Sequence, residues 1–149
     1  ISHRLKSGII IGFEFIKEKN VIGFSNSAFR AELIPEKLSI PQDVAVVDWF
    51  FYTLLLHAGH KAVFSNEMIT YYRQYSDNMI GINNETLDNY KKKLALKAMH
   101  YRYLSSSFTE FEELAKKYSK EKNLTDIQVS TLLQNNKITY PLWWENIKI

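Results

Sequence analysis

Apolar and polar positions alternate differently in the two parts of this chain. Residues 44–58 (VAVVDWFFYTLLLHA) are apolar on nearly every side, which predicts a buried helix, and Gly59 stands where a helix C-cap is expected. From residue 84 onward, apolar side chains recur every three or four positions, which predicts about three consecutive amphipathic helices. We therefore expect a mixed α/β, helix-rich chain.

The segments around the predicted buried helix indicate short elements joined by loops. Residues 1–20 fit a helix or a strand equally well, and residues 21–33 fit a strand or loop that feeds a short helix ending before Pro35. The runs KAVFS and MITYY, joined by Asn66 and Glu67, predict two short strands. The polar stretch RQYSDNMIGINN that follows predicts a long loop.

The C-terminal part carries helix start signals. Ser107 with Glu110 and Thr125 with Gln128 both have capping-box spacing, in which side chains and backbone N–H groups bond reciprocally. In the first of the three amphipathic helices expected after residue 84, the apolar residues share one side and the lysines lie on the other, solvated faces. These lysines are Lys91, Lys92, Lys93 and Lys97. The tail at 140–149 contains Pro-Leu-Trp-Trp and is expected to dock on the body of the protein.

Composition narrows the classes of protein to consider. The 149 residues are 46% hydrophobic and 14% aromatic, which excludes a disordered chain, and the lack of Cys excludes disulfides and thiolate sites. The net charge of +3 arises within residues 85–149 and is too small to indicate a nucleic-acid groove. No apolar run reaches the roughly 18 residues of a membrane span. The chain starts at Ile1 rather than Met, so we expect a piece of something longer.

Asp48 is the residue that does not fit its surroundings, because it stands inside the apolar run VVDWFF. A buried carboxylate costs several kcal/mol unless it is paired or hydrogen-bonded. It could be the N-cap of a helix that begins there, accepting backbone N–H bonds of the first turn. It could equally be a functional carboxylate in an apolar shell, with a pKa raised toward that of a general base. Residue chemistry alone leaves both open.

Three segments, in order and spacing, resemble the second half of a family 2 glycosyltransferase of the GT-A fold. They are GFSNSAFR at 23–30, VDWF at 47–50 and YRQYSDNMIG at 72–81. In that family a glycine-containing loop precedes an acidic motif on a helix, and a Tyr-Arg-Gln-His type motif follows. The resemblance covers about residues 15–85. It implies an acceptor-side part of a catalytic domain at 1–83, with a C-terminal helical extension at 84–149 packed on it.

The resemblance implies an inverting transfer of a sugar from a nucleotide-sugar donor to an acceptor hydroxyl, on a cell-surface glycan. Asp48 takes the place of the general base. Gly23 would let the backbone approach the sugar, Ser25 and Asn26 would hydrogen-bond its hydroxyls, and Trp49 would offer a flat face for stacking. Two further candidates have structural alternatives. Arg73 would bind a phosphate or form an ion pair that holds its loop, and Asn78 would contact substrate or make a turn.

Departures from the family pattern concern the metal and the donor. Tyr75 stands where the family often has a metal-binding His, and a phenol is a poor ligand for Mg²⁺ or Mn²⁺. No Asp-x-Asp motif is present in the sequence. The donor-binding half, with the divalent cation, is therefore expected upstream in a full-length enzyme, and no cation is expected to bind to this piece. The isolated piece is expected to be inactive. A cytoplasmic enzyme, peripheral at the inner face of the membrane, would suit a lipid-linked acceptor.

A non-enzymatic alternative stays open. In it the chain is a helical protein-interaction module, and Asp48 is only a cap. His57 and His60 have a spacing that would allow a metal, but Gly59 is expected to end the helix between them and no further ligands are evident.

Overall fold

The computed structural model describes residues 5–71, 86–135 and 144. It divides the chain into two compact units, Ile1–Arg73 and Gln74–Ile149. The predicted boundary between residues 83 and 84 and the break after Arg73 both fall within 72–85, outside the described residues. The functional assignment of the two parts therefore stays a prediction.

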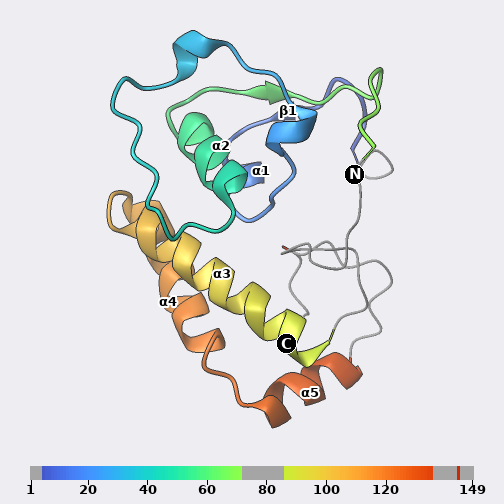
Figure 1. Cartoon of the computed structure of the whole chain (residues 1–149), viewed down its shortest axis with the longest axis vertical. Helices are drawn as coiled ribbons and strands as arrows, with labels where there is room; N and C mark the ends of the chain where they lie inside the picture. Colours follow the sequence, from blue (N-terminus) through green and yellow to red (C-terminus); the bar gives the residue numbers. More distant parts are fainter. Residues whose placement is uncertain (1–4, 72–85, 136–143, 145–149) are drawn as a thin grey trace. The chain divides into compact units, whose positions relative to one another are not determined.

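The first unit is built around one helix and a very small sheet. Its elements are β1 (Ile10–Ile11), α1 (Phe13–Ile16), the 3-10 turns η1 (Phe24–Asn26) and η2 (Ala31–Leu33), α2 (Val47–His57) and β2 (Ala62–Val63). Figure 1 shows α2 at the centre of this unit, enclosed by the long connection that leads into it. The strands β1 and β2 are antiparallel, with Ile10 opposite Val63.

Helix α2 confirms the predicted buried helix. Seven of its eleven residues are buried, so the helix is held by packing on several sides at once. These residues are Trp49, Phe50, Phe51, Tyr52, Thr53, Leu55 and Leu56. Gly59 follows the helix with a φ of +94°, a left-handed conformation that glycine adopts without the steric cost of a Cβ.

Of the two predicted short strands, the one in KAVFS is confirmed and the one in MITYY is wrong, since its described residues 68–71 form no strand. β2 lies in the KAVFS run as expected, but it pairs with β1 near the start of the chain and not with MITYY. Of the MITYY run, Met68, Ile69 and Tyr71 are at least three-quarters exposed, so their apolar side chains gain no burial that would favour a strand. The predicted loop at 73–84 lies outside the described residues.

The second unit contains the three helices that the sequence predicts. Its elements are α3 (Leu87–Ser105), the 3-10 turn η3 (Thr109–Phe111), α4 (Glu112–Glu121) and α5 (Asp126–Asn135). Helix α4 packs along α3 (Figure 1). Between these two helices, the ring of Tyr118 stacks on that of Tyr101 with centroids 5.1 Å apart. The helix-rich, mixed fold class is thus confirmed. None of the helices in the described ranges is long and apolar enough to cross a membrane.

The two predicted capping boxes have different outcomes. Before α5, the Thr125 N–H donates to Gln128 Oε1 at 2.9 Å and the Gln128 N–H donates to Thr125 Oγ1 at 3.3 Å, which confirms that box. The box of Ser107 is wrong, because η3 begins after Phe108 and has no side-chain cap.

The prediction that Lys97 faces solvent is also wrong. Its side chain is only 2% exposed, and its Nζ donates to the Trp144 carbonyl oxygen at 2.7 Å. The ammonium group also lies 5.2 Å from the centre of the Tyr118 ring, which adds a cation–π interaction. The buried charge is thereby compensated, and Trp144 of the predicted docking tail is itself buried in this unit.

His100 makes the second unit sensitive to acid. The side chain is 3% exposed, and burial lowers its pKa from 6.5 to about 3. Between these two pH values the unfolded chain binds more protons than the folded one, so stability falls as the pH is lowered through this window.

We expect His100→Leu to remove this part of the acid sensitivity. The free energy of unfolding is measured by urea denaturation at pH 7, 5 and 4, monitored by far-UV circular dichroism. His60→Leu in the first unit serves as the control. Equal losses of stability in the His100→Leu and unsubstituted proteins between pH 7 and 4 would contradict the prediction.

Candidate functional site

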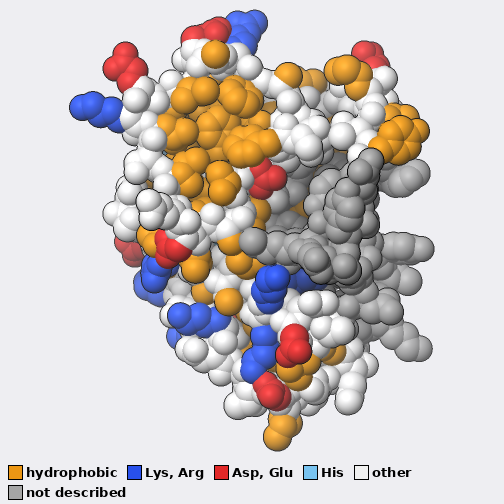
Figure 2. Space-filling view, viewed as in Figure 1, with side chains coloured by type: hydrophobic (Ala, Val, Ile, Leu, Met, Phe, Trp, Pro, Cys, Tyr) orange, Lys and Arg blue, Asp and Glu red, His pale blue; other side chains and the backbone are white. Residues whose placement is uncertain are grey.

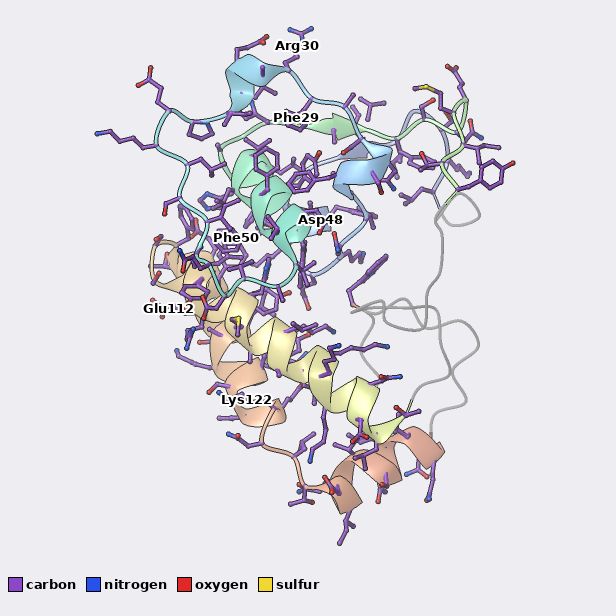
Figure 3. The ribbon with its side chains drawn as sticks, in the orientation of Figure 1. Phe29, Arg30, Asp48, Phe50, Glu112 and Lys122 are labelled. Atoms are coloured by element: carbon purple, nitrogen blue, oxygen red, sulfur yellow. The ribbon has the colours of Figure 1, made fainter. Side chains whose placement is uncertain are left out.

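Asp48 lies in the first turn of α2, but it is not the N-cap. The N-cap position belongs to Val46, whose side chain cannot cap, and Asp48 is the second helical residue (Figure 3). Its Oδ1 accepts the Trp49 N–H at 2.7 Å, so one carboxylate oxygen does bond a backbone group of its own helix. The side chain is half-buried. The structure therefore combines features of both alternatives for this residue.

The loop at 23–27 brings a glycine against the carboxylate. A Cβ built on Gly23 would lie 3.3 Å from Asp48 Oδ2 and 3.2 Å from Asn26 Oδ1, both closer than an ordinary contact. The φ of Gly23 is −105°, so it is this close approach and not backbone strain that favours glycine here. Asn26 Oδ1 accepts the Gly23 N–H at 2.8 Å and closes the turn. Three predicted site residues are thus brought together.

Burial is the main influence on the Asp48 carboxyl group, and it raises the pKa of that group above 3.8. Hydrogen bonds from the Trp49 N–H, from the Asn20 side chain and from its own backbone N–H oppose this effect by favouring the charged form. Asn20 must donate through its amide nitrogen, since a carboxylate only accepts. The result is a carboxylate that binds a proton more readily than an exposed aspartate does.

Ser27 and Tyr52 join this group, although sequence reasoning missed them. The Ser27 hydroxyl donates to the Gly23 carbonyl oxygen at 2.6 Å, and its Oγ lies 2.5 Å from the Tyr52 hydroxyl oxygen. A signal was available for Tyr52, because it follows Asp48 by four positions and so lies on the same face of α2. For Ser27 the sequence carried no signal beyond its place in the loop.

Aromatic rings cover this side of α2. Phe24 and Phe29 each pack against Phe51 and Tyr52, with ring centroids 5.2–6.1 Å apart. Both remain more than 40% exposed, and Figure 2 shows hydrophobic side chains gathered on the visible face of the first unit. These rings leave Tyr52 only 4% exposed, whereas its hydrogen-bond partner Ser27 is half-buried, so the bond between them is partly shielded from water.

The other predicted site residues are placed less favourably. Trp49 is fully buried, and its indole N–H donates to the Ile16 carbonyl oxygen at 2.9 Å. The expectation that it offers a stacking face to a sugar is therefore corrected: its ring belongs to the core. Ser25 lies exposed on η1. Arg73 and Asn78 lie outside the described residues, as does Tyr75.

A metal centre is not evident in the part of the chain that the structure describes. That part holds no group of three or more His, Asp or Glu side chains able to bind an ion. His57 lies in the last turn of α2 with its ring edge-to-face on Phe13, at 4.9 Å between centroids. The packing of its ring on Phe13 therefore explains the position of His57 without a metal.

Comparison with known proteins adds no relative. No protein-family model, no curated protein and no solved structure matches this chain. The residues of the site are therefore the basis for assigning a function.

Proposed function

We propose that this chain is the acceptor-side part of an inverting, nucleotide-sugar-dependent glycosyltransferase, with Asp48 as the general base. One observation carries the proposal. A half-buried carboxylate of raised pKa lies at the start of a buried helix, directly against the backbone of a glycine loop. The same loop and the same aspartate are those that resemble the family 2 motifs.

In the proposed reaction, Asp48 takes the proton of the acceptor hydroxyl. The hydroxyl oxygen forms a bond to the anomeric carbon of the donor, and the bond from that carbon to the nucleotide phosphate oxygen breaks. The electron pair leaves with the nucleotide, and attack from the opposite face inverts the configuration. A positioned base of this kind contributes about 10²–10⁴-fold to the rate. Because burial raises its pKa, the Asp48 carboxylate is a stronger base than an exposed aspartate.

The remaining assignments follow from the same proposal. Asn26 and Ser25 of the loop would contact sugar hydroxyls, and Arg73 and Asn78 would bind substrate from their own segment. The donor nucleotide, with any Mg²⁺ or Mn²⁺, would be held by a half of the enzyme outside these 149 residues, as the resemblance to the family and the lack of an Asp-x-Asp motif in the sequence suggest. The acceptor would be a cell-surface glycan, and its lipid carrier would bring the cytoplasmic enzyme to the membrane surface.

The test begins with the native gene product. Intact-protein mass spectrometry is expected to give a chain about twice this length, which leaves room for a donor-binding half. That product is then incubated with a panel of nucleotide sugars and glycan acceptors, and nucleotide release is measured. Acceptor-dependent release supports the proposal. A native product whose N-terminus lies near Ile1 contradicts the proposal, as does a product that releases no nucleotide from any donor.

A second candidate function is favoured by the bond between Asp48 Oδ1 and the Trp49 N–H, because it gives the carboxylate a structural role in the first turn of α2 without any substrate. In that case the chain is an interaction module of helices. Substitution of Asp48 separates the two functions, because the amide oxygen of asparagine can still accept the Trp49 N–H but cannot take up a proton.

Gly23→Ala is expected to lower the transfer rate about 10- to 100-fold with little loss of stability. The new Cβ would crowd Asp48 Oδ2 and Asn26 Oδ1 and displace the base by a few tenths of an ångström. Small misplacements of reacting groups have effects of this size. Gly12→Ala is the matched control, since its φ is also negative and a Cβ there would meet nothing within 4 Å. Equal rates in both variants would contradict the assigned contact.

A further inference from the structure

A directional chain of hydrogen bonds ties the glycine loop to α2. A serine hydroxyl has one proton, and the Gly23 carbonyl oxygen can only accept, so Ser27 gives its proton to Gly23 at 2.6 Å. The Tyr52 hydroxyl, 2.5 Å from Ser27 Oγ, must then be the donor of the next bond. The order is Tyr52 O–H to Ser27 O–H to Gly23 C=O. Hydrogen bonds in such a chain polarise and strengthen one another.

This chain of hydrogen bonds ends on Gly23, where a Cβ would lie only 3.3 Å from Asp48 Oδ2. Gly23 receives the bond through its carbonyl group, and its Cα faces Asp48 Oδ2. Tyr52 and Asp48 lie one turn apart on α2, so the loop is fastened to the same face of the helix that carries the base. With Tyr52 4% exposed under the aromatic rings and Ser27 half-buried, water has only limited access to the bond.

We propose that Ser27 and Tyr52 are positioning residues for Asp48: their hydrogen bonds hold the Gly23 loop against the carboxylate and keep water away from it. The inference rests on the proposed function only where it calls Asp48 a base. The effect of the loop on the surroundings of the carboxylate is independent of that function. Without the tether, the loop lifts away, the carboxylate gains solvent and its surroundings become those of an exposed aspartate.

The charges of the ionisable groups near Asp48 stay constant in the test. Tyr52 on α2 has an electrostatic interaction with Asp48, and burial raises the pKa of Tyr52, so its hydroxyl stays neutral where Asp48 titrates. Helix α1, which packs on α2, and the turn after α1 carry Glu14, Lys17, Glu18 and Lys19. These four groups remain unchanged in every variant of the test, so differences between variants report the tether.

The test is a titration of Asp48 by carboxyl ¹³C NMR in the full native gene product, assigned with Asp48→Asn. Tyr52→Phe and Ser27→Ala are expected to lower the pKa of Asp48 by about half a unit toward its ordinary value. Ser27→Thr keeps the hydroxyl and is expected to leave the titration near that of the unsubstituted protein. Tyr71→Phe is the matched control, because Tyr71 is 91% exposed. An unchanged pKa in Tyr52→Phe and Ser27→Ala overturns the inference.

Kinetics give a second, separate readout. In the transfer assay, Tyr52→Phe is expected to lower kcat about tenfold with KM little changed, and to move the acid limb of the pH–rate profile to lower pH. If the unsubstituted protein transfers no sugar, the proposed function fails while the titration still decides the inference. If it transfers sugar but Tyr52→Phe shifts neither the titration nor the acid limb, the inference alone fails.

Discussion

Replacing Asp48 with asparagine abolishes sugar transfer and keeps the fold, if the carboxylate is the base. An amide cannot take up the acceptor proton, so the rate is expected to fall by about 10²–10⁴-fold. The amide oxygen can still accept the Trp49 N–H, which Asp48 Oδ1 accepts at 2.7 Å, so unfolding free energy is expected to change by less than about 1 kcal/mol. Nucleotide release and urea unfolding measure the two effects on the same preparation.

The control for this variant is Glu36→Gln, the same loss of charge at an exposed carboxylate of the same unit. The pH profile gives independent support. Burial raises the pKa of Asp48, so in the unsubstituted enzyme the rate falls as the pH is lowered through a value above 3.8, where the carboxylate gains a proton. A fully active Asp48→Asn variant would refute the assignment of Asp48 as the base. The interaction module would be favoured if the unsubstituted protein transfers no sugar and the Asp48→Asn variant still folds and binds a partner.

Trp49→Ala is expected to destabilise the first unit by about 3–5 kcal/mol, the usual range for emptying a buried tryptophan site. The ring is fully buried, and its indole N–H binds the Ile16 carbonyl oxygen at 2.9 Å, which joins α2 to the end of α1. Because whole domains are stable by only about 5–15 kcal/mol, this loss would open much of the unit. Hydrogen exchange of α2 amides, read by mass spectrometry, measures it.

A milder variant and a control keep the test decisive. Trp49→Phe retains most of the ring but leaves the Ile16 carbonyl oxygen without its donor, so it is expected to cost about 1–3 kcal/mol. Tyr71→Ala removes a large aromatic side chain that is 91% exposed and should change little. If Trp49→Ala left α2 protected and weakened only the binding of a sugar, the stacking role suggested by the sequence would be restored.

The sequence carried enough information for the elements whose cause is local. Residues 47–57 form a helix because they are apolar all round and a glycine follows them, and the period of three to four residues after position 84 predicts α3, α4 and α5. Asp48 was recognisable for a similar reason. A charge inside an apolar run is anomalous on chemistry alone, whatever the run packs against, and Gly23 was found through the same resemblance that places Asp48.

Tertiary structure decided which side chain meets which. Tyr52 reaches Ser27 across 25 positions, Trp49 reaches Ile16 across 33 and Lys97 reaches Trp144 across 47. Local periodicity says which residues share a helix face, but not what will cover that face. An apolar helix with no polar side gives no indication of which ring points to the core and which to a ligand, and a lysine between apolar residues looks solvated until a distant carbonyl group compensates its charge. Those pairings depend on how the chain packs, and only the folded chain could show them.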